Sequence, residues 1–571
     1  MSSVIGVTDF DLIVRNGLVI DGSGAAPRHA DVGVREGQIS IVGTVDGHAA
    51  RVVDASGAVV APGFVDIHTH YDGQATWDSH LAPSAWHGVT TVVMGNCGVG
   101  FAPVRHGDHD RLIELMEGVE DIPGAALHEG LSWQWESFDE YLGAIERRPH
   151  DIDVAAQVPH GALRLYVMGE RGANREVATE DEIAEMGRIA AEAVEAGALG
   201  FTTSRTLNHR TSRGEPTPTL TASRAELVGI AAAIGATGKG VLQVVSDFID
   251  FDDEMATFRE MAAVSGRPLS LSLAQHVRRP LQHRRVLDAL AEANAEGLEM
   301  RAQVAARAIG VLVGLQGSIN PLRGCPTFQS IADIGHDALV ARLKEPDVRA
   351  AIIAELSEHQ SAFIADAGKA YVLGAEPDYE PDSAASLAGT AARAGVSLAE
   401  CLYEVLLTDG GRGMVYVPVL NYVDGNLDAV GEMLADPNAV PGLSDGGAHV
   451  GMICDGSFPT TLITHWARDR RRGPRFELPW LISRQTRATA ETVGLLDRGL
   501  LAPGLRADIN VIDVEALKLG SPELAFDLPA GGKRFLQRAH GYRHTFVAGV
   551  ETYVDGEPTG ALPGRLVRGG R

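Results

Sequence analysis

The chain has 571 residues, of which 45% are apolar and 22% charged, a composition typical of a soluble globular protein with more than one domain. Its formal net charge of −26 disfavours anionic partners, so we expect it to bind neither nucleic acid nor an anionic lipid surface. Four scattered cysteines provide no disulfide framework and favour a reducing compartment. The sequence shows no signal-peptide pattern and no stretch apolar enough to span a membrane. These features predict a cytoplasmic enzyme that acts on a small molecule.

Both ends of the chain have the pattern of short β-strands. Residues 10–60 alternate apolar runs with turn signals such as Asn16-Gly17 and Glu36-Gly37. Residues 507–513 and 545–554 have the same character. The two ends could build one small β domain together, or each could form a separate β cap, and the residues alone leave both arrangements open.

The middle of the chain alternates strand and helix patterns, which is typical of a parallel α/β sheet. Capping-box patterns at Thr179–Glu182 and Ser223–Glu226 mark the starts of two of the helices. The repeated strand–helix unit predicts a (β/α)8 barrel of the TIM type. The eight candidate strands are Gly63–His70, Thr90–Gly95, Asp153–His160, Ala198–Ser204, Gly240–Asp247, Pro268–Gln275, Glu299–Ala306 and Val440–Asp445.

One connection in this series is far longer than a normal loop. Residues 311–440 separate the seventh candidate strand from the eighth and contain helical sequence such as Ser397–Leu407. We expect this insertion to form a lid or an accessory lobe.

Four side chains at predicted strand ends are suited to binding a metal ion. His68 and His70 end the first strand, and residues two apart in a strand point to the same face. Cys97 follows the second strand, and Asp445 ends the eighth, which lies next to the first when a barrel closes. Imidazole, thiolate and carboxylate are all zinc ligands, so the four groups predict a metal centre. Cys97 could instead be a buried small residue, and Asp445 a helix cap.

A metal centre of this kind suggests hydrolysis. A bound metal lowers the pKa of water, and Asp445 could take the water proton and return it to a leaving nitrogen. His160, after the third strand, or His449 could stabilise the oxyanion, and both are candidate substrate contacts. A structural, hydrogen-bonded histidine is the alternative interpretation of His160.

Several segments resemble the N-acyl-D-amino-acid deacylases, or D-aminoacylases, of the amidohydrolase superfamily. They are residues 61–70, 88–98, 116–123, 163–169 and 498–508. The resemblance implies a metal-bearing barrel over residues 62–490, carrying the insertion, and a β-sandwich built from residues 1–61 and 491–571. It also implies zinc or another divalent metal, one or two ions, with Cys97 able to bridge two positions. Related enzymes are often homo-oligomers.

The chain departs from this family pattern at several positions. The family histidines on strands five and six are absent, since these strands read Gln243-Val-Val-Ser-Asp247 and Leu271-Ser-Leu-Ala-Gln275. The family lysine and tyrosine that hold the substrate carboxylate are also absent, so Arg307 is a candidate replacement, with a solvated surface arginine as the alternative. A second metal position is therefore in doubt.

The sequence favours a metal-dependent hydrolase that cleaves a carboxamide C–N bond, in particular that of an N-acyl amino acid. Three alternatives remain at this stage. The substrate could be a cyclic imide, a lactam or an ester; the protein could be a non-catalytic scaffold; or it could be a metal-dependent decarboxylase or lyase. Retention of His68, His70, Cys97 and Asp445 together speaks against the scaffold.

Overall fold

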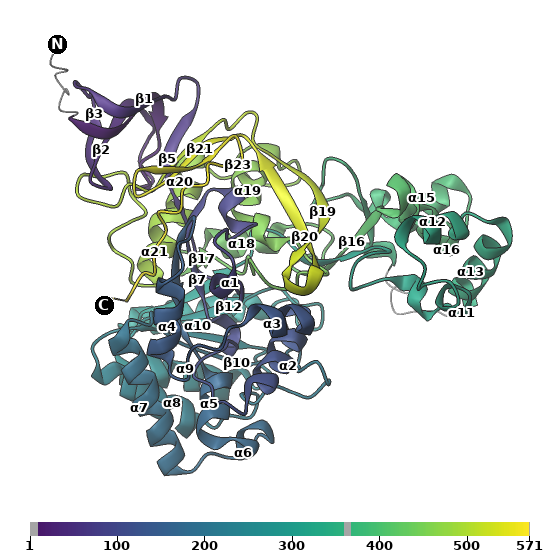
Figure 1. Ribbon diagram of the computed structural model, residues 1–571, viewed down its shortest axis with the longest axis horizontal. Coiled ribbons are helices and arrows are strands. Elements are labelled where there is room, and N and C mark those ends of the chain that lie inside the picture. Colours follow the sequence, from purple (N-terminus) through teal and green to yellow (C-terminus); the bar gives the residue numbers. More distant parts are fainter. Residues whose placement is uncertain (1–8, 359–366, 570–571) are drawn as a thin grey trace.

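The computed structural model describes residues 9–358 and 367–569, and Figure 1 shows a large body with a lobe projecting from one side. Parallel strands form two sheets in the body, and every neighbouring pair in them is parallel. The smaller sheet contains β6 (Phe64–Asp66), β7 (Val89–Met94) and β8 (Asp153–Ala156). The larger sheet contains β9 (Val158–Pro159), β10 (Gly200–Arg205), β11 (Val241–Ser246), β12 (Leu269–Leu273), β13 (Met300–Val304) and β17 (Ala439–Pro441). The fold is therefore mixed α/β with parallel sheets.

The two parallel sheets approach each other at both edges. At one edge a single residue separates β8 from β9. At the other, the backbone N–H of Asp445 donates to the carbonyl of His68 at 3.1 Å, and that of His70 donates to Gly446 at 2.8 Å. The segment after β17 therefore lies beside the segment after β6.

The strands are shorter than the sequence pattern predicts at the positions that matter most. β6 ends at Asp66 and β17 at Pro441, so His68, His70 and Asp445 all follow their strands instead of ending them. The segments with these three residues still run side by side, joined by the bridge between Thr69 and Gly446.

Amphipathic helices follow the strands. α7 (Glu180–Ala196) begins with the predicted capping box, in which Thr179 and Glu182 exchange hydrogen bonds. α8 (Arg224–Ala236) has only half of one, because Ser223 accepts from the Glu226 backbone while the Glu226 carboxylate bonds elsewhere. The pattern at Ser223 thus predicted the helix start correctly, but the Glu226 carboxylate contacts His160 and Arg164 instead of capping the helix.

Strands from both ends of the chain share one sheet. Its order is β23-β22-β21-β18-β5-β1-β2-β3, with β4 (Ala49–Asp54) paired to β1. The strands from the N-terminal part are β1 (Phe10–Val19), β2 (Arg28–Arg35), β3 (Gln38–Gly43) and β5 (Val59–Pro62). Those from the C-terminal part are β18 (Ile509–Ile512), β21 (Tyr542–Val547), β22 (Val550–Val554) and β23 (Glu557–Pro558). Leu12, Val32, Val511 and Phe546 pack in one apolar core, which explains why the two ends come together.

A hairpin near the C-terminus leaves this sheet. β19 (Lys518–Leu528) and β20 (Gly532–His540) pair only with each other and form the long yellow ribbon of Figure 1. The Phe535 backbone N–H donates to the Val450 carbonyl at 2.6 Å, so the hairpin lies against the segment that follows Asp445.

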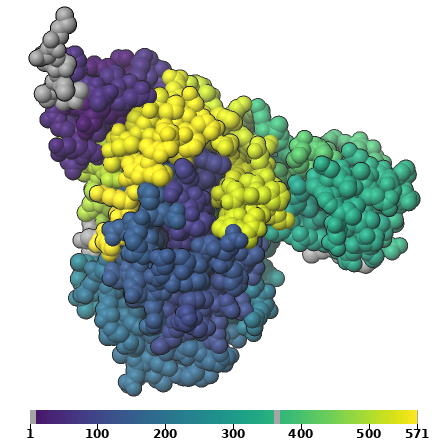
Figure 2. Space-filling view, in the orientation of Figure 1, coloured from purple at the N-terminus to yellow at the C-terminus, as the bar shows by residue number. Residues whose placement is uncertain are grey.

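The lobe that stands away from the body in Figure 2 is built from residues 309–420, which overlap the stretch 311–440 expected as an insertion. Its antiparallel sheet contains β14 (Ile309–Val313), β16 (Met414–Leu420) and β15 (Tyr371–Leu373). Helices α12 (His336–Leu343), α13 (Pro346–Glu358), α15 (Leu387–Ala394) and α16 (Leu398–Leu406) surround a separate apolar core. α18 (Asp428–Ala435) has returned to the body, where it packs on β17 and on α10 (Gln282–Ala295).

Among the described helices, none combines the length and the apolar character that crossing a membrane would require.

Candidate metal centre

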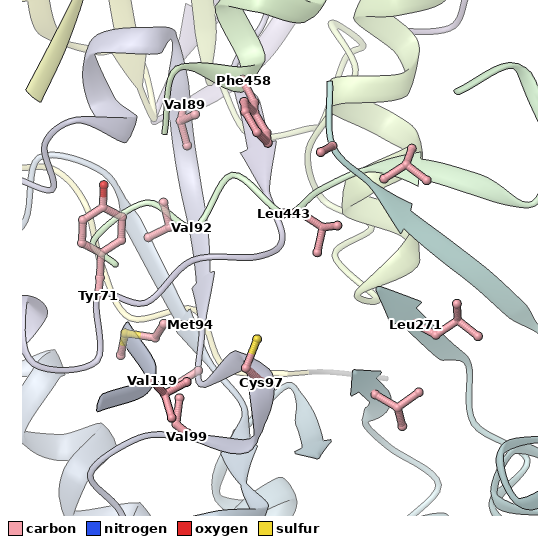
Figure 3. Close-up of a cluster of buried hydrophobic side chains, with 14 of the residues drawn as sticks. Tyr71, Val89, Val92, Met94, Cys97, Val99, Val119, Leu271, Leu443 and Phe458 are labelled. Carbon is pink, nitrogen blue, oxygen red and sulfur yellow. The ribbon is translucent and has the colours of Figure 1, made fainter. Parts of the chain in front are cut away.

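The predicted ligands converge at the carboxyl ends of the parallel strands. Ligand atoms of His68, His70 and Cys97 all lie within 4.8 Å of one another. The Nε2 atom of His68 is 3.2 Å from the Cys97 sulfur and 3.4 Å from Asp445 Oδ1, and His70 Nε2 is 3.6 Å from that same oxygen. Figure 3 shows the Cys97 thiol among side chains from distant segments, including Leu271 and Leu443. The structure thus brings together all four predicted ligands.

Backbone conformation explains how Cys97 reaches this position. β7 ends in a short turn, Asn96–Gly98, in which Cys97 itself has a positive φ of 56°. A side chain on Gly98 would place its Cβ 3.1 Å from the Thr203 Cα atom, so glycine is needed there for close approach to β10. The Asn96 amide donates to the carbonyls of Thr69 and Val93 and ties the turn to the histidine segment.

Several of these buried polar atoms have no hydrogen-bond partner. Both ring nitrogens of His70 and both carboxylate oxygens of Glu120 lack one among the described residues. Buried polar groups are normally satisfied, and an unsatisfied cluster indicates a ligand that completes it. A divalent cation fits this cluster, because the residues offer imidazole nitrogens, a thiol and carboxylates at one point.

The electrostatics of the site also favour a bound cation. Burial raises the pKa of Cys97 well above its usual range, and the Glu120 and Asp445 carboxylates add to the effect. Burial also raises the pKa of Glu120. Burial alone would raise the pKa of Asp445, but its contact with His70 and the charges of nearby histidines hold it below its usual range. A bound cation would favour the anionic forms of Cys97 and Glu120, which burial disfavours.

One further residue orients the first histidine. The Gln303 side chain on β13 lies 2.7 Å from His68 Nδ1 through its amide oxygen, and its amide nitrogen donates to Ser270 at 2.9 Å. This arrangement leaves His68 Nε2 to face Cys97 and Asp445. Ligand histidines characteristically use their second nitrogen in such a bond.

Sequence reasoning did not identify Glu120, although it singled out the surrounding segment 116–123. Glu120 ends α2 (His109–Glu120), is 1% exposed, and lies 3.3 Å from His70 Nδ1. Its other oxygen lies 3.4 Å from His449 Nε2. No pattern in one sequence links a helix end to a histidine 50 residues earlier, so only the structure reveals this contact.

His449 lies beside the centre, as expected for a substrate contact. It has a positive φ of 48°, as do Leu443 at 58° and Asp445 at 47°. Such conformations are uncommon for residues other than glycine and occur preferentially at functional sites. The His449 side chain is 26% exposed, so a ligand can reach it.

His160 does not match its predicted substrate contact. It begins α5 (His160–Met168) and is fully buried, with Nδ1 2.8 Å from the Thr203 hydroxyl and Nε2 2.9 Å from Glu226. Both ring nitrogens therefore already have partners, and neither is left for a substrate. The structural alternative accounts for this histidine.

Arg307 is not a surface residue, because only 1% of it is exposed. Its guanidinium lies 3.1 Å from Asp455 and stacks on the Tyr379 ring, 3.4 Å from the ring centroid. Two guanidinium nitrogens have no partner among the described residues. Asp455 and Asp445 line the same small pocket, so Arg307 lies behind its wall.

The strands that lack the family histidines carry other polar groups inside the body. Gln243 on β11 and Ser272 on β12 lie 3.3 Å apart through side-chain atoms. His276, the histidine nearest to this position, lies beyond β12 in a bridge with Arg279. These strands therefore carry an amide and a hydroxyl, and neither contains a histidine.

Comparison with known proteins supports this description. A D-aminoacylase of Alcaligenes xylosoxydans xylosoxydans is 40% identical over 195 residues, which are 34% of this chain and 37% of that protein. An N-acyl-D-glutamate deacylase from the same organism is 34% identical over 267 residues, 47% of this chain and 49% of the relative. An uncharacterized protein of Mycobacterium tuberculosis is 27% identical over 543 residues. This match covers 88% of this chain and 84% of that protein.

Solved structures show the same fold. A D-aminoacylase with a binuclear metal centre superposes with a TM-score of 0.65 at 24% identity, over 98% of this chain and 100% of that one. The zinc-bound N-acyl-D-glutamate deacylase of Bordetella bronchiseptica gives a TM-score of 0.63 at 24% identity, over 98% and 99% of the two chains. The family model described as the amidohydrolase family matches residues 51–559. The chain therefore belongs to the amidohydrolase family.

Proposed function

We propose that the protein is a metal-dependent hydrolase that cleaves the carboxamide C–N bond of an N-acyl amino acid. The observation that carries this proposal is the convergence of His68, His70 and Cys97 within 4.8 Å, with the Asp445 carboxylate beside them. The relatives named D-aminoacylase and N-acyl-D-glutamate deacylase favour an N-acyl amino acid as the substrate.

We propose zinc as the metal, held by His68, His70, Cys97 and Asp445. When bound, such a metal polarises a carbonyl group and lowers the pKa of water toward neutrality. The absence of histidine from β11 and β12 favours one ion over two, because a second ion would lack imidazole ligands there.

In this proposal Asp445 is the general base. Its carboxylate is ionised at neutral pH, since the pKa lies below the usual range, so it can accept a proton from the attacking water. The proton then passes to the leaving nitrogen, which departs as an amine. Asp445 is 16% exposed, unlike the nearly fully buried histidines beside it, so water and substrate can reach it.

Two further side chains are proposed to bind the substrate. His449 borders the site and retains an exposed edge. Arg307 lies behind the pocket wall and has guanidinium nitrogens without partners among the described residues. These nitrogens could bind a substrate carboxylate that reaches past Asp455. His160 is left out of the proposal because both of its nitrogens are engaged.

We propose that the two parallel sheets form one closed eight-stranded barrel over residues 62–490, with β8 and β9 as one interrupted strand. The hydrogen bonds between residues 445–446 and 68–70 support closure at the other edge. In this division residues 1–61 and 491–571 form a β-sandwich, and the lobe is the insertion at 311–440. The hairpin of β19 and β20 then lies within the sequence range of the sandwich, but it packs at the mouth of the barrel.

The test is hydrolysis of a panel of N-acetylated D- and L-amino acids by protein loaded with zinc or manganese. We expect release of acetate and free amino acid that depends on added metal and is lost with a chelator. Inactivity toward every member, with metal bound, would contradict the proposal. The same panel should include a hydantoin and a lactone, since cleavage of those alone would favour a cyclic substrate.

A further inference from the structure

A further histidine lies in the loop after β10, at the strand end next to the turn that carries Cys97. His209 lies in this loop, and its Nδ1 atom is 2.9 Å from the hydroxyl of Ser204, near the end of β10. The turn that carries Cys97 packs against the same strand end, since a Cβ on Gly98 would lie 3.2 Å from the Ser204 backbone nitrogen. Ser204 therefore places His209 on the Cys97 side of the site.

The loop is held in place from two sides. Asp247, after β11, accepts hydrogen bonds from the Thr206 hydroxyl at 2.7 Å and from the Leu207 backbone at 2.8 Å. On the other side, the Ser212 backbone donates to the Glu114 carbonyl of α2 at 2.9 Å. His209 thus lies between two anchors, and α2 also carries Glu120 at its end.

The electrostatic surroundings of His209 agree with the position that its bond to Ser204 gives it. Burial, together with the nearby His449 and His70, lowers the pKa of its imidazole to about 3, although Asp445 opposes them. Groups that influence one another in this way lie close together. His209 is consequently neutral at physiological pH and cannot serve as a cationic acid.

Within residues 9–358 and 367–569 the imidazole of His209 is bonded through Nδ1, and no bond involves its Nε2 atom. The group of ligand atoms within 4.8 Å of one another includes His68, His70 and Cys97 but not His209. With the Ser204 hydroxyl assigned as the donor to Nδ1, the neutral imidazole carries its proton on Nε2. This atom can then donate a hydrogen bond into the site.

We propose that His209 contacts the substrate and donates a hydrogen bond from Nε2 to the oxygen of the scissile carbonyl as negative charge develops there. Ser204 is the positioning residue that selects this tautomer. A fixed neutral donor stabilises an oxyanion without having to lose a proton itself. The inference rests on the proposed amide hydrolysis and assigns one step of it to a residue outside the resemblance.

The test compares His209→Ala, His209→Gln and Ser204→Ala with Asn208→Ala, a neighbour whose exposed side chain serves as the control. For the best panel substrate we expect His209→Ala to lower kcat by about 100-fold, with KM and metal content close to those of the wild type. His209→Gln should recover part of the loss, since its amide can donate. The kcat of Ser204→Ala should lie between those of the wild type and His209→Ala.

Two results would overturn the inference. One is a kcat of His209→Ala within about twofold of the control, and the other is a loss of metal from this variant, which would make His209 a ligand. If the wild type hydrolyses no panel member, the proposed function fails on its own. In that case the affinity of the zinc-loaded protein for methylphosphonate tests the role of His209. We expect His209→Ala to bind this anion about tenfold more weakly than the wild type. Unchanged affinity would contradict the contact.

Discussion

Two buried clusters of histidine and carboxylate lie near each other at the ends of neighbouring strands, and they differ in how well their atoms are satisfied. In the first, called here the Glu226 cluster, His160 and Arg164 both bond to the Glu226 carboxylate. Every ring nitrogen of His160 and every guanidinium nitrogen of Arg164 has a partner. Among the described residues only Oε2 of Glu226 is left without a partner, so this cluster is a nearly complete structural support.

The second cluster, called here the His70 cluster, consists of His68, His70, Cys97, Glu120 and Asp445. Both nitrogens of His70 and both carboxylate oxygens of Glu120 are buried without a hydrogen-bond partner among the described residues. Burying unsatisfied polar groups costs free energy that a protein avoids elsewhere. The difference teaches that residue type and burial do not distinguish a support from a site, whereas unmet bonding capacity does.

The largest expected effect comes from Asp445, the exposed member of the His70 cluster. Asp445→Asn should reduce turnover by about 1,000-fold or more, because the amide cannot accept the water proton. Metal analysis of the same preparation should show most of the metal retained, since the other ligands are intact. Full activity of this variant would remove Asp445 from the mechanism.

Glu120 tests whether the His70 cluster depends on residues beyond the ligands. Glu120→Gln should weaken metal binding by about 10- to 100-fold, because the carboxylate no longer fixes His70 through Nδ1. Competition with a chelator measures the affinity. Glu117, which lies on the same helix and caps Gly124 instead, provides the control: Glu117→Gln should bind metal like the wild type. Equal affinities for both variants would show that the Glu120 contact has no role in metal binding.

The smallest expected effect on catalysis comes from the Glu226 cluster. Glu226→Gln should lower the free energy of unfolding by about 3 kcal/mol at neutral pH, because two buried partners lose their counter-charge. Activity per folded molecule should stay near that of the wild type. Glu182→Gln, at the matching helix position but on the surface, should cost less than about 1 kcal/mol. Loss of bound metal from Glu226→Gln would show that the Glu226 cluster supports the metal centre, and would contradict the distinction between the two clusters.

The stability difference at Glu226 should also depend on pH. Burial favours a higher pKa, but hydrogen bonds and charges from His160 and Arg164 hold the pKa below the usual 4.5. A lowered carboxylate pKa contributes stability above the unfolded value and loses it as pH falls through the folded value. Urea unfolding of wild type and Glu226→Gln should therefore converge below pH 4.5, and a constant gap would contradict this assignment.

The sequence predicted most of the His70 cluster because strand ends bring distant residues to one face. His68, His70 and Asp445 end predicted strands and Cys97 follows one, and parallel strands end at the same side. Arg307 and His160 were harder, because neither burial nor the bonds to Asp455 and Glu226 can be read from local patterns.

Glu120 and His209 could not be predicted at all. One is the last residue of a helix and the other lies in a loop, so their places depend on how those segments pack. The hairpin of β19 and β20 is a similar case: its strand pattern gives no sign that Phe535 bonds to the segment after Asp445. Local periodicity predicts elements, and contacts between elements far apart in sequence require the fold.

The central claim is that the His70 cluster holds a cation. A crystal structure of metal-replete protein, with anomalous scattering recorded at the zinc edge, tests it directly. We predict one strong peak about 2.0–2.3 Å from the nearest atoms of His68, His70, Cys97 and Asp445. No peak at this position in protein shown to be active, or a peak elsewhere with these side chains bonded only to each other, would contradict the claim.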